Sequence, residues 1–179
     1  VVRNLDKVID KNFYPCEKTK NSNYNYRPLG IGVQGLIDVF QDLEYPIESQ
    51  FAADLNRKIF EHIYFAAIEA STELAKEKGT YQKFESSPAA QGELSYHLWK
   101  ETPRDKSLNW ALLKHNVIKF GLRHSLLIAC MPTASTGQIY FSKLFLLPAF
   151  LLIINFEKFI KGTERNFFLI ILMIIICSL

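Results

Sequence analysis

A buried apolar run that leads into a group of hydroxyl residues constrains the fold of this chain more than any other stretch. Residues 125–129 (SLLIA) form a continuous apolar run, which is typical of strands that are buried on both faces of a parallel sheet. Residues 132–136 (PTAST), called the hydroxyl turn here, follow and place three hydroxyl side chains within four positions. The pattern predicts a strand that delivers small polar residues to the N-terminus of a helix.

The hydroxyl turn has two interpretations. It is typical of a phosphate-binding loop, because free backbone N–H groups, the positive end of a helix dipole and Ser or Thr donors converge at such a place. It also fits an ordinary N-capped turn that carries no ligand. These residues alone leave both interpretations open.

The composition changes abruptly near Tyr140. The chain of 179 residues is 49% hydrophobic and 22% charged, and its net charge of +3 is too small to indicate a nucleic-acid or membrane-surface partner. Of the last 40 residues, however, 23 are Ile, Leu or Phe. We therefore predict two parts, a globular domain over residues 1–139 and a hydrophobic helical tail over residues 140–179.

The three cysteines show neither a CxxC motif nor metal-ligand spacing, and the four histidines are scattered. Free thiols of this kind fit a reducing compartment, so the sequence predicts a cytoplasmic protein without a zinc site. Cys130 lies next to the hydroxyl turn, and we expect it to be a small buried thiol rather than a reactive group.

Hydrophobic periodicity and helix-breaking residues predict four helices. The first ends before Pro15 and has Val1, Leu5 and Val8 on one apolar face, with Val2 and Ile9 beside them. Residues 16–26 follow as a polar surface loop. The other helices are predicted at residues 36–43, about 50–78 and 110–120.

Two of these helices have a capping residue at each end. Ser49 and Asn109 are predicted N-caps, and Gly79 and Gly121 are predicted to end the same two helices. The longest helix has apolar residues every three or four positions, at Ala52, Leu55, Ile59, Ile63, Ala66, Ala70 and Leu74. Its opposite face, which includes Glu61, is predicted to face solvent. In the turn-rich segment at residues 81–103, we expect Trp99 to be a packing anchor.

Gly30, Gly32 and Gly35 match the GxGxxG pattern, but the dinucleotide-binding interpretation fails. That fingerprint needs a hydrophobic strand before it and an acid at the end of a second strand, whereas here a polar loop precedes and Asp54 lies in a predicted helix. The glycines instead predict a strand that another backbone or a ligand approaches closely. Together with residues 125–129 and the helices, this strand predicts an α/β fold with parallel strands that is part of a larger barrel.

Three motifs, in this order and spacing, resemble signature segments of the ribonucleotide reductase large subunit. They are RPLGIGVQGL at residues 27–36, the run from Trp110 to Pro132 with GLRH at residues 121–124, and MPTASTGQI at residues 131–139. The resemblance covers residues 1 to about 139 and is to eukaryotic or eukaryotic-like members.

The resemblance implies a helix-rich, partial slice of a ten-stranded α/β barrel. It implies an oxidoreductase that converts ribonucleoside diphosphates to deoxyribonucleoside diphosphates by radical chemistry. It also implies that backbone N–H and hydroxyl groups of the hydroxyl turn hold the substrate diphosphate, which favours the phosphate-binding interpretation. The residues carried over for this role are Pro132, Thr133, Ala134, Ser135 and Thr136.

The resemblance further implies the partners of the intact enzyme. These are a metal-containing small subunit that supplies the radical, a second large subunit, thioredoxin or glutaredoxin as reductant, and ATP or deoxynucleotide effectors. For this chain we expect no bound cofactor or metal, no nucleic acid and no membrane association.

The family's radical-bearing cysteine lies in an Asn-x-Cys-x-Glu loop and its radical relay uses adjacent tyrosines, and neither pattern occurs here. The pair of cysteines that reduces the substrate also has no counterpart. We therefore expect an internal fragment of the catalytic subunit that has no catalytic residue and is inactive alone. The alternatives are a non-catalytic nucleotide-binding or subunit-pairing module, and a protein tethered to a membrane by its tail.

The tail contains two apolar runs of about 13 residues, at residues 144–156 and 167–179, and Pro148 interrupts the first. A membrane-spanning helix needs about 20 apolar residues. A membrane hairpin, a short anchor and a buried helix remain alternatives, but we favour a tail that arises from an unspliced intron or a mispredicted gene end, because the family pattern stops there.

Overall fold

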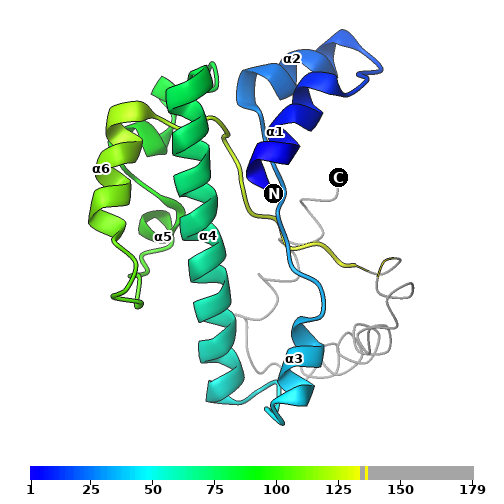
Figure 1. Cartoon of the computed structure of the whole chain (residues 1–179), viewed down its shortest axis with the longest axis vertical. Helices are drawn as coiled ribbons and strands as arrows, with labels where there is room; N and C mark the ends of the chain where they lie inside the picture. Colours follow the sequence, from blue (N-terminus) through cyan, green and yellow to red (C-terminus); the bar gives the residue numbers. More distant parts are fainter. Residues whose placement is uncertain (134–135, 137–179) are drawn as a thin grey trace, which may run out of the picture. The chain divides into compact units, whose positions relative to one another are not determined.

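The computed structural model describes residues 1–133 and residue 136, and this part of the chain is mainly helical (Figure 1). Its helices are α1 (Val2–Lys11), α2 (Glu17–Tyr26), α3 (Leu36–Asp42), α4 (Gln50–Lys78), α5 (Ser95–Leu98) and α6 (Trp110–Phe120), with 3-10 turns η1 (Phe84–Ser86) and η2 (Pro88–Gln91). The predicted tail, residues 140–179, lies outside the described residues.

The chain divides into two compact units. The first comprises Val1–Ile31 and Arg57–Ile128, and the second comprises Gly32–Asn56 and Ala129–Leu179. Helix α4 therefore contributes its first two turns to the second unit and its remaining length to the first.

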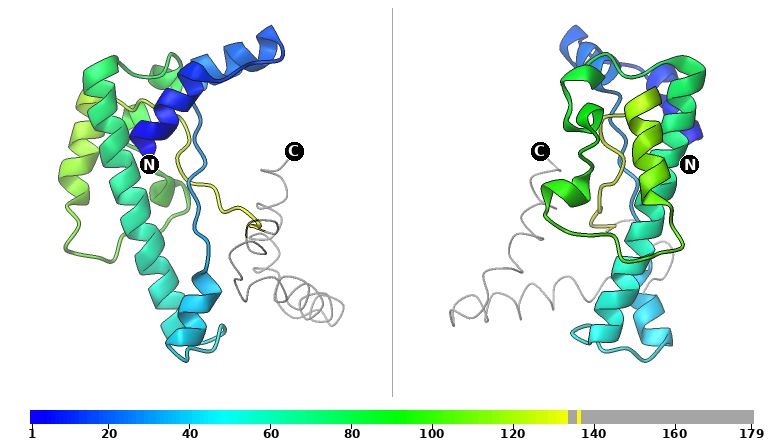
Figure 2. Two further views of the ribbon diagram at one scale, coloured as in Figure 1. Left: turned by 45° about the vertical axis from the view of Figure 1, so that its right-hand side comes forward. Right: turned by 90° about the vertical axis from the view of Figure 1, so that its left-hand side faces the viewer.

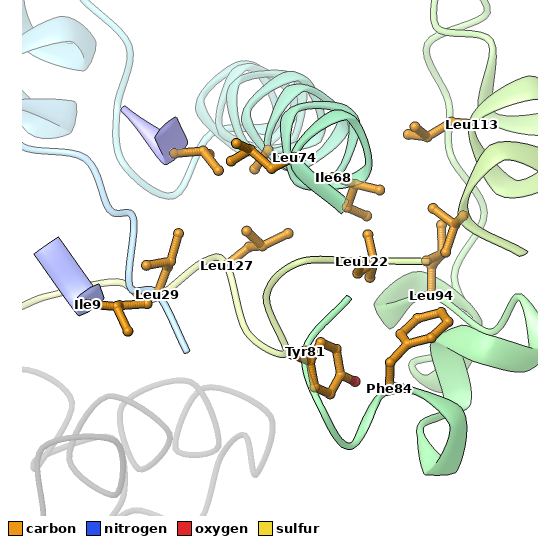
Figure 3. Packing of buried hydrophobic residues seen from close by; sticks show 13 residues of the cluster. Ile9, Leu29, Ile68, Leu74, Tyr81, Phe84, Leu94, Leu113, Leu122 and Leu127 are labelled. Carbon is orange, nitrogen blue, oxygen red and sulfur yellow. The ribbon is translucent and has the colours of Figure 1, made fainter. Parts of the chain in front are cut away.

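The core of the first unit is built largely from α4, α6 and the segments around them. Helix α6 runs alongside the C-terminal half of α4 (Figures 1 and 2). Ile68 of α4 and Val117 of α6 are 1% and 0% exposed, and burial of such a side chain contributes about 1.5–3 kcal/mol. The buried core residues, shown in Figure 3, are Val2, Ile9, Leu29, Ala67, Ile68, Leu74, Tyr81, Phe84, Leu94, Leu113, Val117, Leu122 and Leu127.

Helix α1 ends before Pro15 as predicted, but only part of its predicted apolar face is buried. Val1 and Val8 are 81% and 54% exposed, whereas Val2, Asp6 and Ile9 are buried. The buried face of α1 also carries the Asp6 carboxylate, which forms ion pairs with the buried Arg27 and the more exposed Lys78 and Arg123 of the same unit.

The predicted surface loop at residues 16–26 is wrong, because Glu17–Tyr26 form α2. No residue of this helix is buried, so it lacks the hydrophobic periodicity that reveals most helices. The helix ends at Arg27, which adopts a left-handed conformation with φ of 45° and donates its N–H to Asn23 O at 2.7 Å. Arg27 is itself buried, so tertiary contacts fix the end of this helix.

Helix α4 has the predicted bounds and the predicted end residues. Ser49 Oγ accepts a hydrogen bond from Ala52 N at 3.2 Å, as an N-cap does. Gly79 follows the last turn with φ of 83°, the left-handed conformation for which glycine is preferred.

The buried face of α4 differs in part from the predicted one. Ala66 is exposed, while Ser71 and Thr72 are 0% and 2% exposed. These hydroxyls can be buried because they are hydrogen-bonded, Thr72 Oγ1 to Ile68 O at 2.9 Å and Ser71 within a polar cluster described below.

Glu61, predicted to face solvent, instead anchors a loop. Its Oε1 accepts hydrogen bonds from the backbone N–H groups of Arg104 and Asp105, both at 3.1 Å, and from Trp110 Nε1 at 3.3 Å. One carboxylate oxygen thus fixes the chain just before α6.

Trp110, and not Trp99, is the packing anchor. Trp99 is 66% exposed. The Trp110 ring lies 5.1 Å from the Phe65 ring and 5.0 Å from the Tyr96 ring, both edge to face. The predicted cap of α6 is confirmed, since Asn109 Oδ1 accepts from Leu112 N at 3.0 Å.

The predicted strand at residues 125–129 is reduced to a single parallel bridge, and Leu126 is 64% exposed, so burial on both faces was also wrong. The bridge joins Ile31 to Ile128, and the backbone bonds are Leu29 N to Leu126 O and Ile31 N to Leu127 O, both 2.9 Å. The two donor residues are two positions apart, whereas the two acceptor residues are adjacent. The hydrogen bonds therefore do not continue as the regular ladder of a parallel sheet. Residues 1–133 are therefore helix-rich and contain no regular strand, so they do not confirm the predicted slice of an α/β barrel.

The second unit has a small core of its own. Ile37 and Phe40 of α3 and Ala52 of α4 are buried together. Tyr45 stacks on Phe51, with ring centroids 5.5 Å apart. This core joins α3 to the first turns of α4.

Candidate functional site

The hydroxyl turn is described at Pro132, Thr133 and Thr136, whereas Ala134 and Ser135 lie outside the described residues. Thr133 has φ of 54°, a left-handed conformation that is a genuine outlier for a β-branched residue. Backbone strain of this kind is concentrated at ligand clamps and active sites. The turn thus has an unusual backbone at the position where the sequence predicts phosphate contacts.

The hydroxyl groups of this turn bond within it. Thr133 Oγ1 donates to Pro132 O at 2.8 Å, and Thr136 Oγ1 donates to Thr133 O at 3.3 Å. Both side chains are attached to the turn's own carbonyl groups, and Thr136 is exposed. Each hydroxyl could exchange its carbonyl for a ligand oxygen by rotation about one bond.

Gly32 makes the close approach that the glycine pattern predicted. A Cβ atom at Gly32 would lie 2.6 Å from Ala129 O and 3.0 Å from Met131 Cε, closer than side chains tolerate. Glycine is therefore required here for space. It allows two backbone segments of the second unit to pass in contact immediately before the hydroxyl turn.

Cys130 does not match its prediction as a buried core thiol. The residue is exposed, and partial desolvation raises the pKa of its thiol. A raised pKa leaves less reactive thiolate at neutral pH, so the interpretation as a non-reactive group is retained.

A second group of polar residues lies in the first unit and was not predicted from the sequence. Asp6 is completely buried and is its centre. Asp6 Oδ1 accepts from Arg27 Nη2 at 2.6 Å, and Oδ2 accepts from Lys78 Nζ at 2.7 Å. We call this group the Asp6 cluster, and its members are Asp6, Arg27, Ser71, Lys78, Arg123 and His124.

Arg27 and Arg123 connect the Asp6 cluster to a second acid of α1 and to the C-terminal end of α4. Arg27 also donates to Asp10 Oδ1 at 2.8 Å, so it binds two carboxylates of α1. Arg123 Nε lies 3.3 Å from Asp6 Oδ1, and Arg123 Nη1 donates to the backbone oxygens of Lys78 and Gly79 at 3.2 Å. A cation at the end of α4 complements the negative end of the helix dipole.

The charges of the Asp6 cluster shift the pKa values within it. Burial raises the pKa of Asp6, but hydrogen bonds from Lys78 and Arg27 outweigh this effect and hold its pKa far below the usual value. Burial also lowers the pKa of His124 to about 4, where the Asp6 carboxylate opposes the shift. At neutral pH the cluster therefore contains an ionised Asp6 and a neutral His124.

Ser71, His124 and Asp6 form a hydrogen-bonded chain that superficially resembles a hydrolase triad. Ser71 Oγ lies 3.0 Å from His124 Nδ1, and His124 Nε2 lies 3.3 Å from Asp6 Oδ1. All three side chains are 0% exposed, so no substrate reaches the hydroxyl. The arrangement stabilises the fold and does not form a nucleophilic site.

A sequence signal for the Asp6 cluster existed. Asp6 lies between Val2 and Ile9 at helical spacing, and an acid on a buried helix face requires a partner.

Among residues 1–133, no group of three or more His, Cys, Asp and Glu side chains could hold a metal ion. No helix of this part of the chain is long and apolar enough to cross a membrane.

Comparison with known proteins adds independent information. The family model described as ribonucleotide reductase, barrel domain, matches residues 1–152. A ribonucleoside-diphosphate reductase large subunit of Caenorhabditis elegans is 52% identical over 139 residues, which cover 78% of this chain and 18% of the relative. The large chain of Schizosaccharomyces pombe is 53% identical, with 78% and 17% covered, and the large subunit of vaccinia virus (strain Copenhagen) is 53% identical, with 78% and 18% covered.

The chain spans less than a fifth of the length of these relatives. The aligned 139 residues and the match over residues 1–152 both include most of the chain. Both findings agree with the three motifs that contain Arg27, Gly32 and the hydroxyl turn. The chain belongs to the ribonucleotide reductase barrel-domain family.

Proposed function

We propose that this chain contributes the substrate-phosphate loop of a ribonucleoside-diphosphate reductase large subunit, and that the hydroxyl turn is this loop. The observation that carries the proposal is the position of the turn, which lies inside the family match and has the left-handed backbone at Thr133. The close packing of Gly32 against Ala129 and Met131 supports it, because a phosphate loop needs a fixed backbone at its start.

The chemistry of the loop follows from its donors. The backbone N–H groups of residues 133–136 and the hydroxyls of Thr133, Ser135 and Thr136 donate to the oxygens of a diphosphate. Hydrogen bonds to a charged phosphate are roughly twice as strong as those to a neutral carbonyl. Thr133 and Thr136 therefore gain free energy when they exchange their present carbonyl partners for phosphate oxygens.

Reduction of the bound ribose requires parts beyond the described residues. In this proposal a metal-containing small subunit supplies the radical, thioredoxin or glutaredoxin supplies the electrons, and ATP or deoxynucleotides act as effectors. A second large subunit completes the assembly. The part played by this chain is to bind and orient the diphosphate.

Titration of the ¹⁵N-labelled chain with ADP tests the loop directly. We expect the amide resonances of Thr133 and Thr136 to shift with ADP and not with adenosine, because the phosphates make the contacts. The binding is expected to be weaker than micromolar, since the loop is one part of a larger site.

Two variants complete this experiment. Ser135→Ala combined with Thr136→Ala removes two donors and is expected to abolish the shifts, whereas Thr102→Ala removes an exposed hydroxyl outside the loop and is expected to preserve them. Equal shifts with ADP and adenosine, or full binding by the double variant, would contradict the proposal.

A further inference from the structure

The hydrogen bonds of Ser71 determine the protonation state of His124. Ser71 Oγ accepts from the backbone N–H groups of Arg123 and His124, both at 3.2 Å, so its two lone pairs are occupied. Its own hydrogen must then point to His124 Nδ1, which lies at 3.0 Å. Nδ1 is therefore an acceptor and carries no proton.

The opposite side of the ring leads to the same assignment. His124 Nε2 lies 3.3 Å from Asp6 Oδ1, and an ionised carboxylate only accepts hydrogen bonds. The ring must therefore carry its proton on Nε2. A second proton on Nδ1 would face the occupied Ser71 oxygen and would break the chain of hydrogen bonds.

The Asp6 carboxylate raises the pKa of His124, but burial together with Arg27 and Arg123 lowers it by more. Asp6 of α1 faces Nε2, and Ser71 of α4 faces Nδ1. The remaining charged groups on Asp6 are Arg27, Lys78 of α4 and Arg123. A protonated His124 would be a fourth cation on one buried carboxylate that already pairs with three, so the cost of burying the added charge would not be compensated.

The same contacts hold the segment that leads to the hydroxyl turn. Arg123 and His124 are bound through their backbone to Ser71. The next residues pair with the chain after α2, through the bonds Ser125 N to Tyr26 O, Leu29 N to Leu126 O and Ile31 N to Leu127 O. Residue 129 follows directly, and the hydroxyl turn begins three residues later.

We propose that Ser71, His124 and Asp6 form a buried, pH-sensitive relay that positions the segment Arg123–Ile128, and that protonation of His124 releases this segment. The proposal deepens the proposed function, because the segment continues into the phosphate loop. Ser71 and His124 are positioning residues and contact no substrate. The relay makes the start of the loop well ordered at neutral pH and loosens it in acid.

The ligand-free chain of 179 residues tests the relay by NMR. Two-bond ¹H–¹⁵N correlation of His124 is expected to show the neutral Nε2–H tautomer at pH 7. The imidazole is expected to remain neutral at pH 5. Hydrogen exchange at Leu29 and Ile31 reports on opening of the segment. With a pKa of about 4 when closed and about 6.5 when open, the opening equilibrium is expected to rise about 60-fold between pH 7 and pH 4.5.

Three variants separate the relay from general packing. His124→Asn cannot titrate, so the 60-fold rise in opening is expected to disappear. His115→Asn, an exposed site on α6, is expected to leave the rise unchanged. Ser71→Ala removes the hydroxyl acceptor and is expected to weaken protection already at pH 7.

The relay is overturned by an Nδ1–H tautomer, by a His124 pKa at or above its ordinary value, by an equal pH response in His124→Asn, or by the absence of amide protection at pH 7. If His124→Asn does not fold, the tautomer and the pKa of His124 in the wild-type chain decide by themselves whether the relay exists. Because no ligand is present, failure of ADP binding would contradict the proposed function and leave the relay standing.

Discussion

Replacement of Asp6 by Asn is the sharpest test of how this fold is stabilised. Asn has nearly the same shape as Asp, but it removes the negative charge that Arg27, Lys78 and Arg123 share. Removal of one partner from a buried ion pair costs about 3–5 kcal/mol, because the other charge stays buried and unpaired.

The structure indicates the lower end of this range. Arg27, with a side chain 4% exposed, has little access to water, but it keeps Asp10 at 2.8 Å. Lys78 is 38% exposed and can be hydrated. Arg123 keeps its bonds to the backbone at the end of α4. We therefore expect Asp6→Asn to lower the free energy of unfolding by about 3 kcal/mol, most of it from Arg27.

Urea unfolding followed by circular dichroism measures this change. The control is Glu77→Gln, which breaks an exposed pair with Arg3 and is expected to change the free energy of unfolding far less than Asp6→Asn. Asp6→Leu combined with Arg27→Met removes both charges and is expected to recover part of the loss, because neither charge is then left unpaired. A loss for Asp6→Asn no larger than that of the control would refute this account of the cluster.

Further predictions concern pH, packing and thiol reactivity. Because folding lowers the pKa of His124 from 6.5 to about 4, neutral His124 contributes about 3 kcal/mol to the free energy of unfolding above pH 6.5, and this contribution is lost as the pH falls toward 4. The lowered pKa of Asp6 extends the loss of stability to lower pH. Urea midpoints measured as a function of pH test both expectations. Gly32→Ala is expected to cost about 1–3 kcal/mol by overpacking against a backbone oxygen, measured as a lower urea midpoint. Iodoacetamide is expected to alkylate Cys16 before Cys130 in single-cysteine variants, because hydrogen bonds lower the pKa of Cys16 while desolvation raises that of Cys130.

The helices at residues 36–43, 50–78 and 110–120 were predicted correctly, and two of them have ends that are set by neighbouring residues. Ser49 and Gly79 bound α4, and Asn109 and Gly121 bound α6, through contacts within a few positions of the chain. Such signals can be read without knowledge of the fold. The prediction for residues 16–26 failed because α2 buries no side chain and depends on Arg27, whose partners lie on another helix.

Interactions between distant residues account for the other errors. The role of Trp110 depends on Phe65 and Tyr96, and the inner face of α1 depends on cations at positions 27, 78 and 123. Neither arrangement follows from hydrophobic periodicity, which assigns an aspartate to the surface. For the hydroxyl turn, the position and the close approach of Gly32 could be read from the sequence, while the left-handed Thr133 could not.

The Asp6 cluster also has a consequence for the order in which this chain can fold during synthesis. Asp6 leaves the ribosome before its partners, because Lys78 and His124 follow 72 and 118 residues later. Until Lys78 has been synthesised, the charge of Asp6 is compensated within the cluster only by Arg27, at a separation of 21 residues, and Arg123 follows later still. Closing such long loops is a step of high contact order and slow folding. A nascent chain that ends before residue 123 is therefore expected to leave its first helix undocked and accessible to chaperones.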